Sequence, residues 1–572
     1  MKTTLLALLL LSCCSFFYLY ENDPEDLVEL APDFFVDKSL KDSPKMDMVY
    51  KVFRDLKAAK GDFRSRKPEL HIVKSTGDRG IAVAYSLSGV VKMELKGVEL
   101  CESFGEDAEN AFAVLLGHEL VHIYEKHSWE NLFAWEFGMT SLKNVISNEK
   151  KKDEVQADYL GGVLAYMAGY KVFNMMPDFL DKVYKSYDLK DENMVNYPGI
   201  QQRKLFATET VEKFNHFINL FEMANLLTTQ KMYDYALAYY DEVLQEFKSR
   251  EVYNNIGYLN VQEALTHFSP KENKFYYPLE LDMVSRMSGG KGDDDLDLAY
   301  RERKLLDAIH YFNLAQHYDP HYPIAHLNKA CANALLGVAR PASSELEWMD
   351  ATVSANRAIN LSTGKEEWEN TLADGHVALG IIAGLKKDES GAKKEWQKAL
   401  ALESDHILAK ANLSVFDDTD NPLADRATLQ PSNEMIDGIE YNDIDFGANH
   451  LKFELRVSPT DSLALWRQDF ANSYLIVNES VISDPATPAD TTYVYHEFHL
   501  TSKDYKGQTA KGISLENGTY KLIEEKYGRP HEVLRMGNGS ILHYEFKDQK
   551  LIFQTGPNGK LMRWGIYFVF DE

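Results

Sequence analysis

The pattern of apolar and polar positions differs from one part of this 572-residue chain to the next. Short β-branched runs broken by glycines fill residues 69–101, and they predict two or three strands arranged as a meander. Apolar residues then recur at helical spacing over residues 111–127, 129–146 and 151–168, which predicts helices there. We therefore expect a domain of mixed α+β structure over residues 24–210.

Residues 211–415 are rich in Ala, Leu and Tyr and contain a repeated phrase. AIHYFNLA (308–315) recurs as AKKEWQKA (392–399), with a looser copy, ALAYYDEV, at 236–243. The small residues allow a helix to pack closely on its neighbour, while the aromatic residue fills the space between the two helices. The phrase resembles the second helix of the tetratricopeptide repeat, so we expect an all-α solenoid with an insertion near residues 265–299. A generic helical bundle is the alternative.

Alternation of apolar and polar residues returns in short segments over residues 435–572. Turn-forming residues separate these segments, which predicts a β-rich accessory domain without assigned chemistry. The chain as a whole is therefore predicted to be multidomain, with α+β, all-α and β-rich parts in that order.

The net charge of the chain and its N-terminal pattern indicate which partners and which cellular location to expect. A formal net charge of −26 argues against the clustered Lys and Arg of a phosphate-binding surface, so we expect no nucleic-acid partner. Residues 1–20 place one Lys before a Leu-rich run, the layout of an export signal. LLSC at residues 10–13 resembles a bacterial lipobox, which would put a lipid anchor on Cys13; an uncleaved anchor is the alternative. We expect an exported protein, either periplasmic or a membrane-anchored lipoprotein of a bacterial cell envelope.

The segment LLGHELVHIYEKH, residues 115–127, contains His-Glu-x-x-His on an apolar background. Residues four apart share one face of a helix, so His118 and His122 can direct both imidazoles at one metal ion. Zinc lowers the pKa of a bound water toward about 7, and Glu119 lies where its carboxylate can take the proton as that water attacks. The pattern favours a Zn²⁺-dependent hydrolase; a buried polar patch is the alternative.

A catalytic zinc ion normally has three protein ligands, so the pattern requires one more. EVQAD at residues 154–158 places two carboxylates one turn apart on a predicted helix. Glu154 is expected to ligate the zinc ion. Asp158 is expected to accept a hydrogen bond from the second ring nitrogen of a ligand histidine, which fixes the tautomer. Ala157 and the glycine pair 161–162 would permit close helix packing there.

Taken together, these two motifs resemble those of the gluzincin metallopeptidases of the CAAX prenyl endopeptidase/HtpX-like family. The family pattern is H-E-x-x-H-x-x-x-x-H on one helix and E-x-x-A-D on a later one, and the resemblance covers roughly residues 40–210. It implies a zincin-like peptidase fold for the first domain, and members of this family with appended tetratricopeptide repeats share this order of parts. The membrane helices of the prenyl endopeptidases are missing, so processing of prenylated proteins is not implied.

The family also has a His-Pro pair that precedes an arginine. NYPGIQQR, residues 196–203, supplies Tyr197-Pro198 and Arg203 at these places, with Tyr instead of His. A protonated phenol can donate a hydrogen bond to the oxyanion that forms when a peptide carbonyl is attacked, so Tyr197 is expected to act in catalysis. Packing in the loop before Pro198 is the alternative. Arg203 is expected to support the site, with an ordinary surface charge as the alternative.

These expectations combine in a zinc-dependent endopeptidase acting on protein or peptide substrates. Stacked helix pairs form an extended concave surface, through which the repeats would recruit protein clients or partners. The rival interpretation is a non-catalytic repeat scaffold or chaperone whose zinc domain is latent or regulatory.

Overall fold

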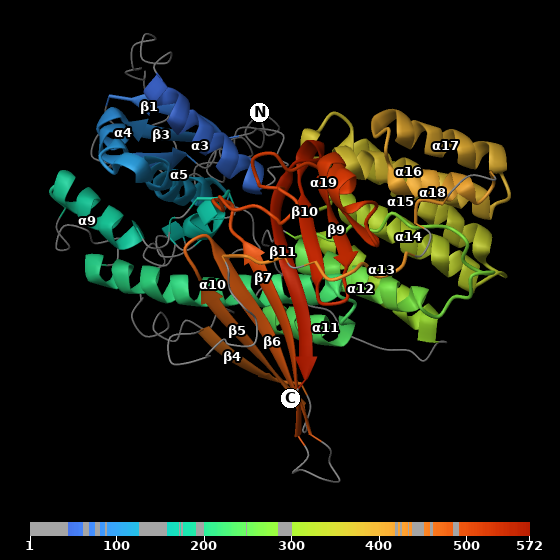
Figure 1. Cartoon of the computed structure of the whole chain (residues 1–572). Helices are drawn as coiled ribbons and strands as arrows, with labels where there is room; N and C mark the ends of the chain where they lie inside the picture. The colour runs from blue at the N-terminus through green and yellow to red at the C-terminus, as the bar shows by residue number, and fades with distance from the viewer. Residues whose placement is uncertain are drawn as a thin grey trace, which may run out of the picture. The chain divides into compact units, whose positions relative to one another are not determined.

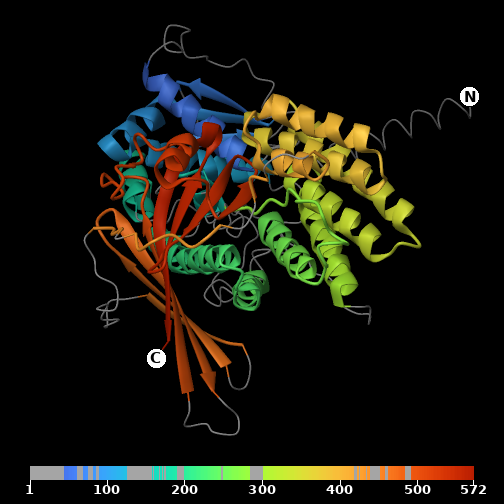
Figure 2. The same cartoon turned by 45° about the vertical axis from the view of Figure 1, so that its right-hand side comes forward.

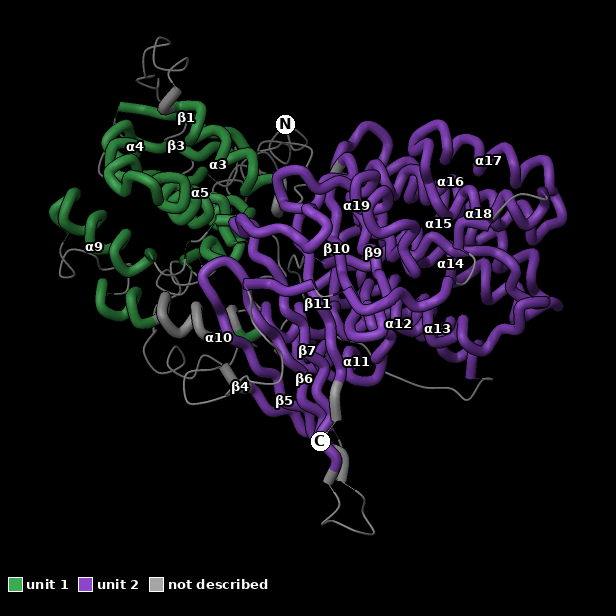
Figure 3. The backbone as a smooth tube through the Cα atoms, in the orientation of Figure 1, with its two compact units in different colours: residues 1–216 green, residues 217–572 purple. Residues whose placement is uncertain are grey.

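The computed structural model describes most of the chain outside its N-terminal part. The described residues are 44–60, 68–74, 81–85, 89–124, 157–158, 160–166, 168–170, 172, 175–189, 199–246, 249–283, 300–417, 421–423, 426–432, 434–437, 451–457, 461–483 and 491–571. The chain divides into two compact units, residues 1–216 and residues 217–572, coloured green and purple in Figure 3. The boundary falls within helix α10 (Ile200–Thr229).

A small mixed sheet lies in unit 1. Its strands are β1 (Glu69–Val73), β2 (Ala82–Tyr85) and β3 (Val90–Glu94), in the order β1-β3-β2. The strands were predicted, but the predicted meander is wrong: β3 lies in the middle, parallel to β1 and antiparallel to β2. The physical reason is burial, since every residue of β3 is buried whereas β1 and β2 are only partly so. A strand that is buried throughout takes the central place in a sheet.

The helices of unit 1 are α3 (Pro44–Lys60), α4 (Leu95–Glu102), a 3₁₀ turn (Gly105–Asp107), α5 (Ala108–Tyr124) and α9 (Met176–Ser186). Helices α4 and α5 pack against this sheet, and α3 and α9 pack on those two helices. Helix α4 follows β3 directly, so the end of the segment predicted as strand is helical instead. Residues 157–158 and 160–166 are helical as well, whereas the helix predicted over residues 129–146 lies outside the described residues.

Unit 2 begins with a series of helices that pack on one another in sequential order, seen from green to yellow in Figures 1 and 2. After α10 they are α11 (Tyr233–Glu246), α12 (Arg250–Leu265), α13 (Tyr300–Tyr318), α14 (Pro323–Ala339), α15 (Ser344–Ser362), α16 (Glu369–Leu385), α17 (Glu389–Leu402) and α18 (Ile407–Ser414), with a 3₁₀ turn at Glu366–Trp368. We call this tetratricopeptide-like series the helical array. Among the helices that the structure describes, none is long and apolar enough to cross a membrane.

The repeated phrase packs as its residue pattern requires. Trp396 of α17 is fully buried against α16, and its Nε1 donates a hydrogen bond to the carbonyl of Val377 at 3.2 Å. A Cβ atom on Gly380 would lie only 2.3 Å from that Nε1, so only glycine allows the two helices to approach this closely. Gly257 of α12 meets Phe312 of α13 in the same way. The predicted burial of Trp396 is thus confirmed.

An antiparallel sheet of eight strands completes unit 2, with the order β4-β5-β6-β7-β11-β10-β9-β8. Its strands are β4 (Leu451–Arg456), β5 (Asp461–Asp469), β6 (Ser473–Ser483), β7 (Thr491–Thr501), β8 (Glu532–Met536), β9 (Gly539–Glu545), β10 (Lys550–Thr555) and β11 (Leu561–Asp571). Helix α19 (Tyr520–Tyr527) precedes β8, and a 3₁₀ turn (Pro557–Gly559) precedes β11. The β-rich part predicted over residues 435–572 is thus one large sheet with a short helix.

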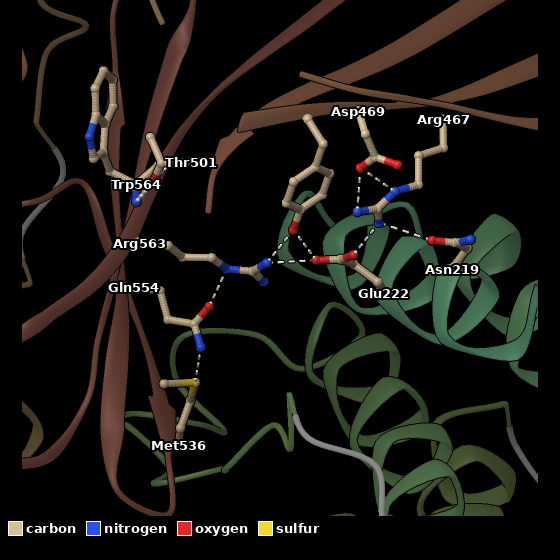
Figure 4. A network of polar contacts seen from close by, with 10 residues as sticks. Asn219, Glu222, Arg467, Asp469, Thr501, Met536, Gln554, Arg563 and Trp564 are labelled. Atoms are coloured by element: carbon tan, nitrogen blue, oxygen red, sulfur yellow. Dashed lines mark hydrogen bonds and ion pairs between the residues drawn. The ribbon is translucent and has the colours of Figure 1, made fainter. Parts of the chain in front are cut away.

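Partly buried polar contacts join this sheet to helix α10. Glu222 of α10 accepts hydrogen bonds from Arg563 Nη1 (2.6 Å) and from the Tyr474 hydroxyl (2.5 Å), and Arg467 Nη1 lies 3.3 Å from its other oxygen (Figure 4). Burial favours the neutral carboxyl, but the two guanidinium groups outweigh it and lower the pKa of Glu222. The helices from residue 217 onward and the sheet lie in the same compact unit.

Candidate metal centre

Helix α5 carries the two candidate histidines on one face, as a spacing of four residues dictates. The rings of His118 and His122 have centroids 4.8 Å apart and stand at 79° to each other. Their Nε2 atoms are 3.1 Å apart. Two nitrogen ligands of a tetrahedral zinc ion, at about 2.05 Å each, are separated by about 3.3 Å. The pair therefore has nearly the spacing of two imidazole ligands to zinc.

Asp158 lies against the opposite side of the His118 ring. Its Oδ1 accepts a hydrogen bond from His118 Nδ1 at 2.9 Å. Because a carboxylate can only accept, the proton of the neutral ring is on Nδ1, and the Nε2 lone pair is directed toward His122. This contact orients the imidazole as a metal ligand needs, through a carboxylate behind the ring.

Arg203, near the start of α10, holds the carboxylate of Asp158 from its other side. Its Nε donates to Oδ2 at 2.7 Å and its Nη2 donates to Oδ1 at 2.6 Å, a two-point contact between planar groups. Burial favours the neutral form of Asp158, but the charge of Arg203 and the hydrogen bond from His118 prevail, so its pKa lies well below the ordinary value. The side chain of Arg203 is only 10% exposed, which is unlike an ordinary surface charge.

Two glycines determine how closely the helical residues around Asp158 approach α5. A Cβ atom on Gly117 would lie 2.6 Å from the carbonyl oxygen of Gly161, and one on Gly161 would lie 2.5 Å from the backbone nitrogen of His118. Ala157 is fully buried at the same place. This backbone contact brings Asp158, one turn before Gly161, to the ring of His118.

Of the three remaining candidate residues, the structure describes Glu119 alone. Glu119 is buried, with 6% of its surface exposed, and follows His118 on α5. Glu154 and Tyr197 lie outside the described residues. Among the residues that are described, no group of three His, Cys, Asp or Glu side chains is placed to hold a metal ion. The described part of the site therefore has two nitrogen donors and the carboxylate–arginine support behind one of them.

Sequence reasoning missed two features of this site. Gly117, directly before His118, was not singled out, although a glycine on each of two apolar helices is a signal for close backbone contact. The bidentate contact of Arg203 with Asp158 had no local signal, because the two residues are 45 positions apart.

The comparisons with known proteins leave the family open. Neither a family model nor a curated protein matches this sequence. Among solved structures, the chain is similar to the C-terminal part of a TPR repeat-containing protein from Cytophaga hutchinsonii, at 12% identity over 49% of this chain and 93% of that chain. The TM-score is 0.22. The helical array is defined by the sequential packing of its helices.

Proposed function

We propose that unit 1 is a zinc-dependent peptidase domain of zincin-like fold. The observation that supports this most directly is the convergence of His118 and His122 Nε2 atoms at 3.1 Å, with Asp158 hydrogen-bonded behind His118. A carboxylate behind the ring is a usual support of a ligand histidine. Arg203 pairs with this carboxylate and keeps it ionised.

In this proposal each residue has a separate task. A zinc ion held by His118, His122 and Glu154 would supply Lewis-acid activation of water. Glu119 accepts the proton of the attacking water and passes it to the leaving amine. Asp158 and Arg203 keep the His118 ring in one tautomer and one orientation. Tyr197 donates a hydrogen bond to the oxyanion.

The wider proposal concerns clients and location. Helix-pair repeats generally serve protein–protein interaction, so the helical array would contact protein substrates or partners. The pattern of an export signal over residues 1–20 supports a cell-envelope location, with Cys13 as the lipid attachment site. Both lie outside the described residues.

Metal analysis combined with casein digestion tests the peptidase proposal. The wild type is expected to bind one zinc ion per chain and to digest casein. Glu119→Gln should keep the metal and lose hydrolysis, because only the proton acceptor is removed. Glu109→Gln is the matched control: it lies on the same helix, is partly exposed and pairs with Lys51 at 2.7 Å. It should keep both properties.

Three outcomes would contradict the proposal at different points. Full zinc occupancy in His122→Ala would place the metal elsewhere. Casein digestion by Glu119→Gln at the wild-type rate would remove Glu119 from the mechanism. Zinc binding without any digestion by the wild type would favour the rival, a scaffold or chaperone with a latent zinc domain.

A further inference from the structure

The chain between α12 and α13 contains an extended segment that runs along the helical array. We call residues 275–282, FYYPLELD, the inserted segment. Apart from a single β-bridge, it forms no helix or strand of its own. Its backbone is nevertheless held closely by residues that are distant in the sequence.

Three asparagines make the same two-point contact with its backbone. In each, the side-chain amide donates to a carbonyl of the inserted segment, while the side-chain oxygen accepts the N–H of the same residue. The pairs are Asn412 with Tyr276 (2.9 and 2.9 Å), Asn328 with Glu280 (2.7 and 2.8 Å) and Asn255 with Asp282 (2.7 and 3.0 Å). All three asparagines are fully buried, and they lie on α18, α14 and α12.

Two of these contacts have the spacing of an extended strand. Residues 280 and 282 are two positions apart, so their backbone groups face the same edge of the segment. A tight turn, in which the N–H of Leu279 donates to the carbonyl of Tyr277 at 3.0 Å, separates them from Tyr276. The other edge faces β8: the N–H of Leu281 donates to the carbonyl of Arg535 at 3.1 Å, and Glu280 forms a parallel bridge with Arg535. The inserted segment thus lies between the helical array and the edge strand of the sheet.

Side chains of the inserted segment fill apolar sites on the helical array. Phe275 is buried, and its ring lies against Gly384, where a Cβ atom would come within 2.7 Å, and 6.0 Å from the ring of Trp396. Leu279 and Leu281 are also buried. Glu280 has its carboxylate at 2.8 Å from the hydroxyl of Thr371 on α16.

Backbone hydrogen bonds combined with pockets for separate side chains are how proteins recognise extended peptides. We propose that the surface formed by Asn255, Asn328 and Asn412 is a peptide-binding groove, and that the inserted segment is its resident ligand, bound in cis and excluding other peptides. The concave surface expected to capture clients would then be closed by the chain itself. This inference is independent of the metal centre.

Competition between the inserted segment and a free peptide of the same sequence tests whether this surface is a peptide-binding groove. A segment tethered by a short linker has an effective concentration of the order of millimolar. A labelled FYYPLELD peptide at about 1 µM is about 10³-fold more dilute than this. The inserted segment of the wild type should therefore exclude the peptide from the groove. The double variant Phe275→Ala/Leu281→Ala removes two anchors of the cis ligand and leaves the groove intact. Fluorescence anisotropy should show saturable binding to this variant and none to the wild type.

The experiment has two controls, and specific results would contradict the proposal. Leu346→Ala, at an exposed position on α15, should behave as the wild type does, and a peptide with both anchors replaced by Ala should bind neither protein. Equal binding to wild type and double variant, or binding to neither when the variant is folded, would overturn the proposal. If the variant does not fold alone, refolding with the peptide should restore its helical circular dichroism, and failure of the peptide to do so would also overturn it.

Discussion

The close contact of two helices at Gly161 makes a specific prediction about the proposed metal centre. In Gly161→Ala the new Cβ atom would lie 2.5 Å from the backbone nitrogen of His118 and 2.8 Å from its Cα atom. These are backbone atoms, which cannot rotate out of the way as a side-chain end can. To reach an ordinary contact distance, the two helices must separate by about 1 Å.

The expected loss of zinc affinity follows from the hydrogen bond that this separation breaks. The hydrogen bond from His118 to Asp158 is 2.9 Å long, and a further 1 Å takes it beyond hydrogen-bonding range. Loss of such a support to a ligand histidine typically weakens metal binding about 10–100-fold, or about 1.4–2.8 kcal/mol. Overpacking itself costs about 1–3 kcal/mol, of which better helix propensity returns about 1 kcal/mol. We expect a folded variant with weakened zinc affinity.

Competition with a chromophoric chelator measures the zinc affinity, and thermal unfolding followed by circular dichroism measures the stability. Gly375→Ala on α16 is the matched control, because its Cβ atom would meet chiefly the side chain of Ile359, which belongs to unit 2. That variant should bind zinc as the wild type does. A zinc affinity for Gly161→Ala within twofold of the wild-type value would refute the link between helix contact and metal binding.

Three further predictions concern other parts of the chain. Trp396→Ala should lower the free energy of unfolding by about 3–5 kcal/mol in urea denaturation, as large-to-small core changes do, and a loss below about 1 kcal/mol would contradict its packing role. Burial and the neighbouring Asp374 raise the pKa of Glu280 well above its ordinary value. The stability that the protonated Glu280 side chain contributes is therefore fully present below the unfolded-state pKa of about 4.3. It is lost as the pH rises toward the pKa of Glu280 in the folded protein. Glu280→Gln should therefore raise Tm relative to wild type at pH 8 but not at pH 4, and the reverse order would show that the carboxyl is ionised in the folded protein. Tyr197→Phe should lower kcat on casein about 100-fold with unchanged zinc content, whereas near-wild-type turnover would return Tyr197 to a packing role.

Local pattern was enough for much of the architecture. A spacing of four residues places His118 and His122 on one helical face whatever surrounds the helix, because 3.6 residues make one turn. The Ala-aromatic-Ala phrase predicted the burial of Trp396, since small residues let another helix approach closely and the aromatic ring fills the space between the two. Alternating segments likewise predicted the β-rich part over residues 435–572.

Pairing partners were decided only by the tertiary structure. The central place of β3 depends on which strand is covered on both faces, and no local pattern states this. The same holds for Arg203, whose contact with Asp158 bridges 45 positions. The three asparagines that bind the inserted segment have no signature at all, because a buried asparagine and a solvated one are identical in a sequence. Periodicity determines which side of an element is apolar, but the groups that meet across elements depend on contacts between distant parts of the chain.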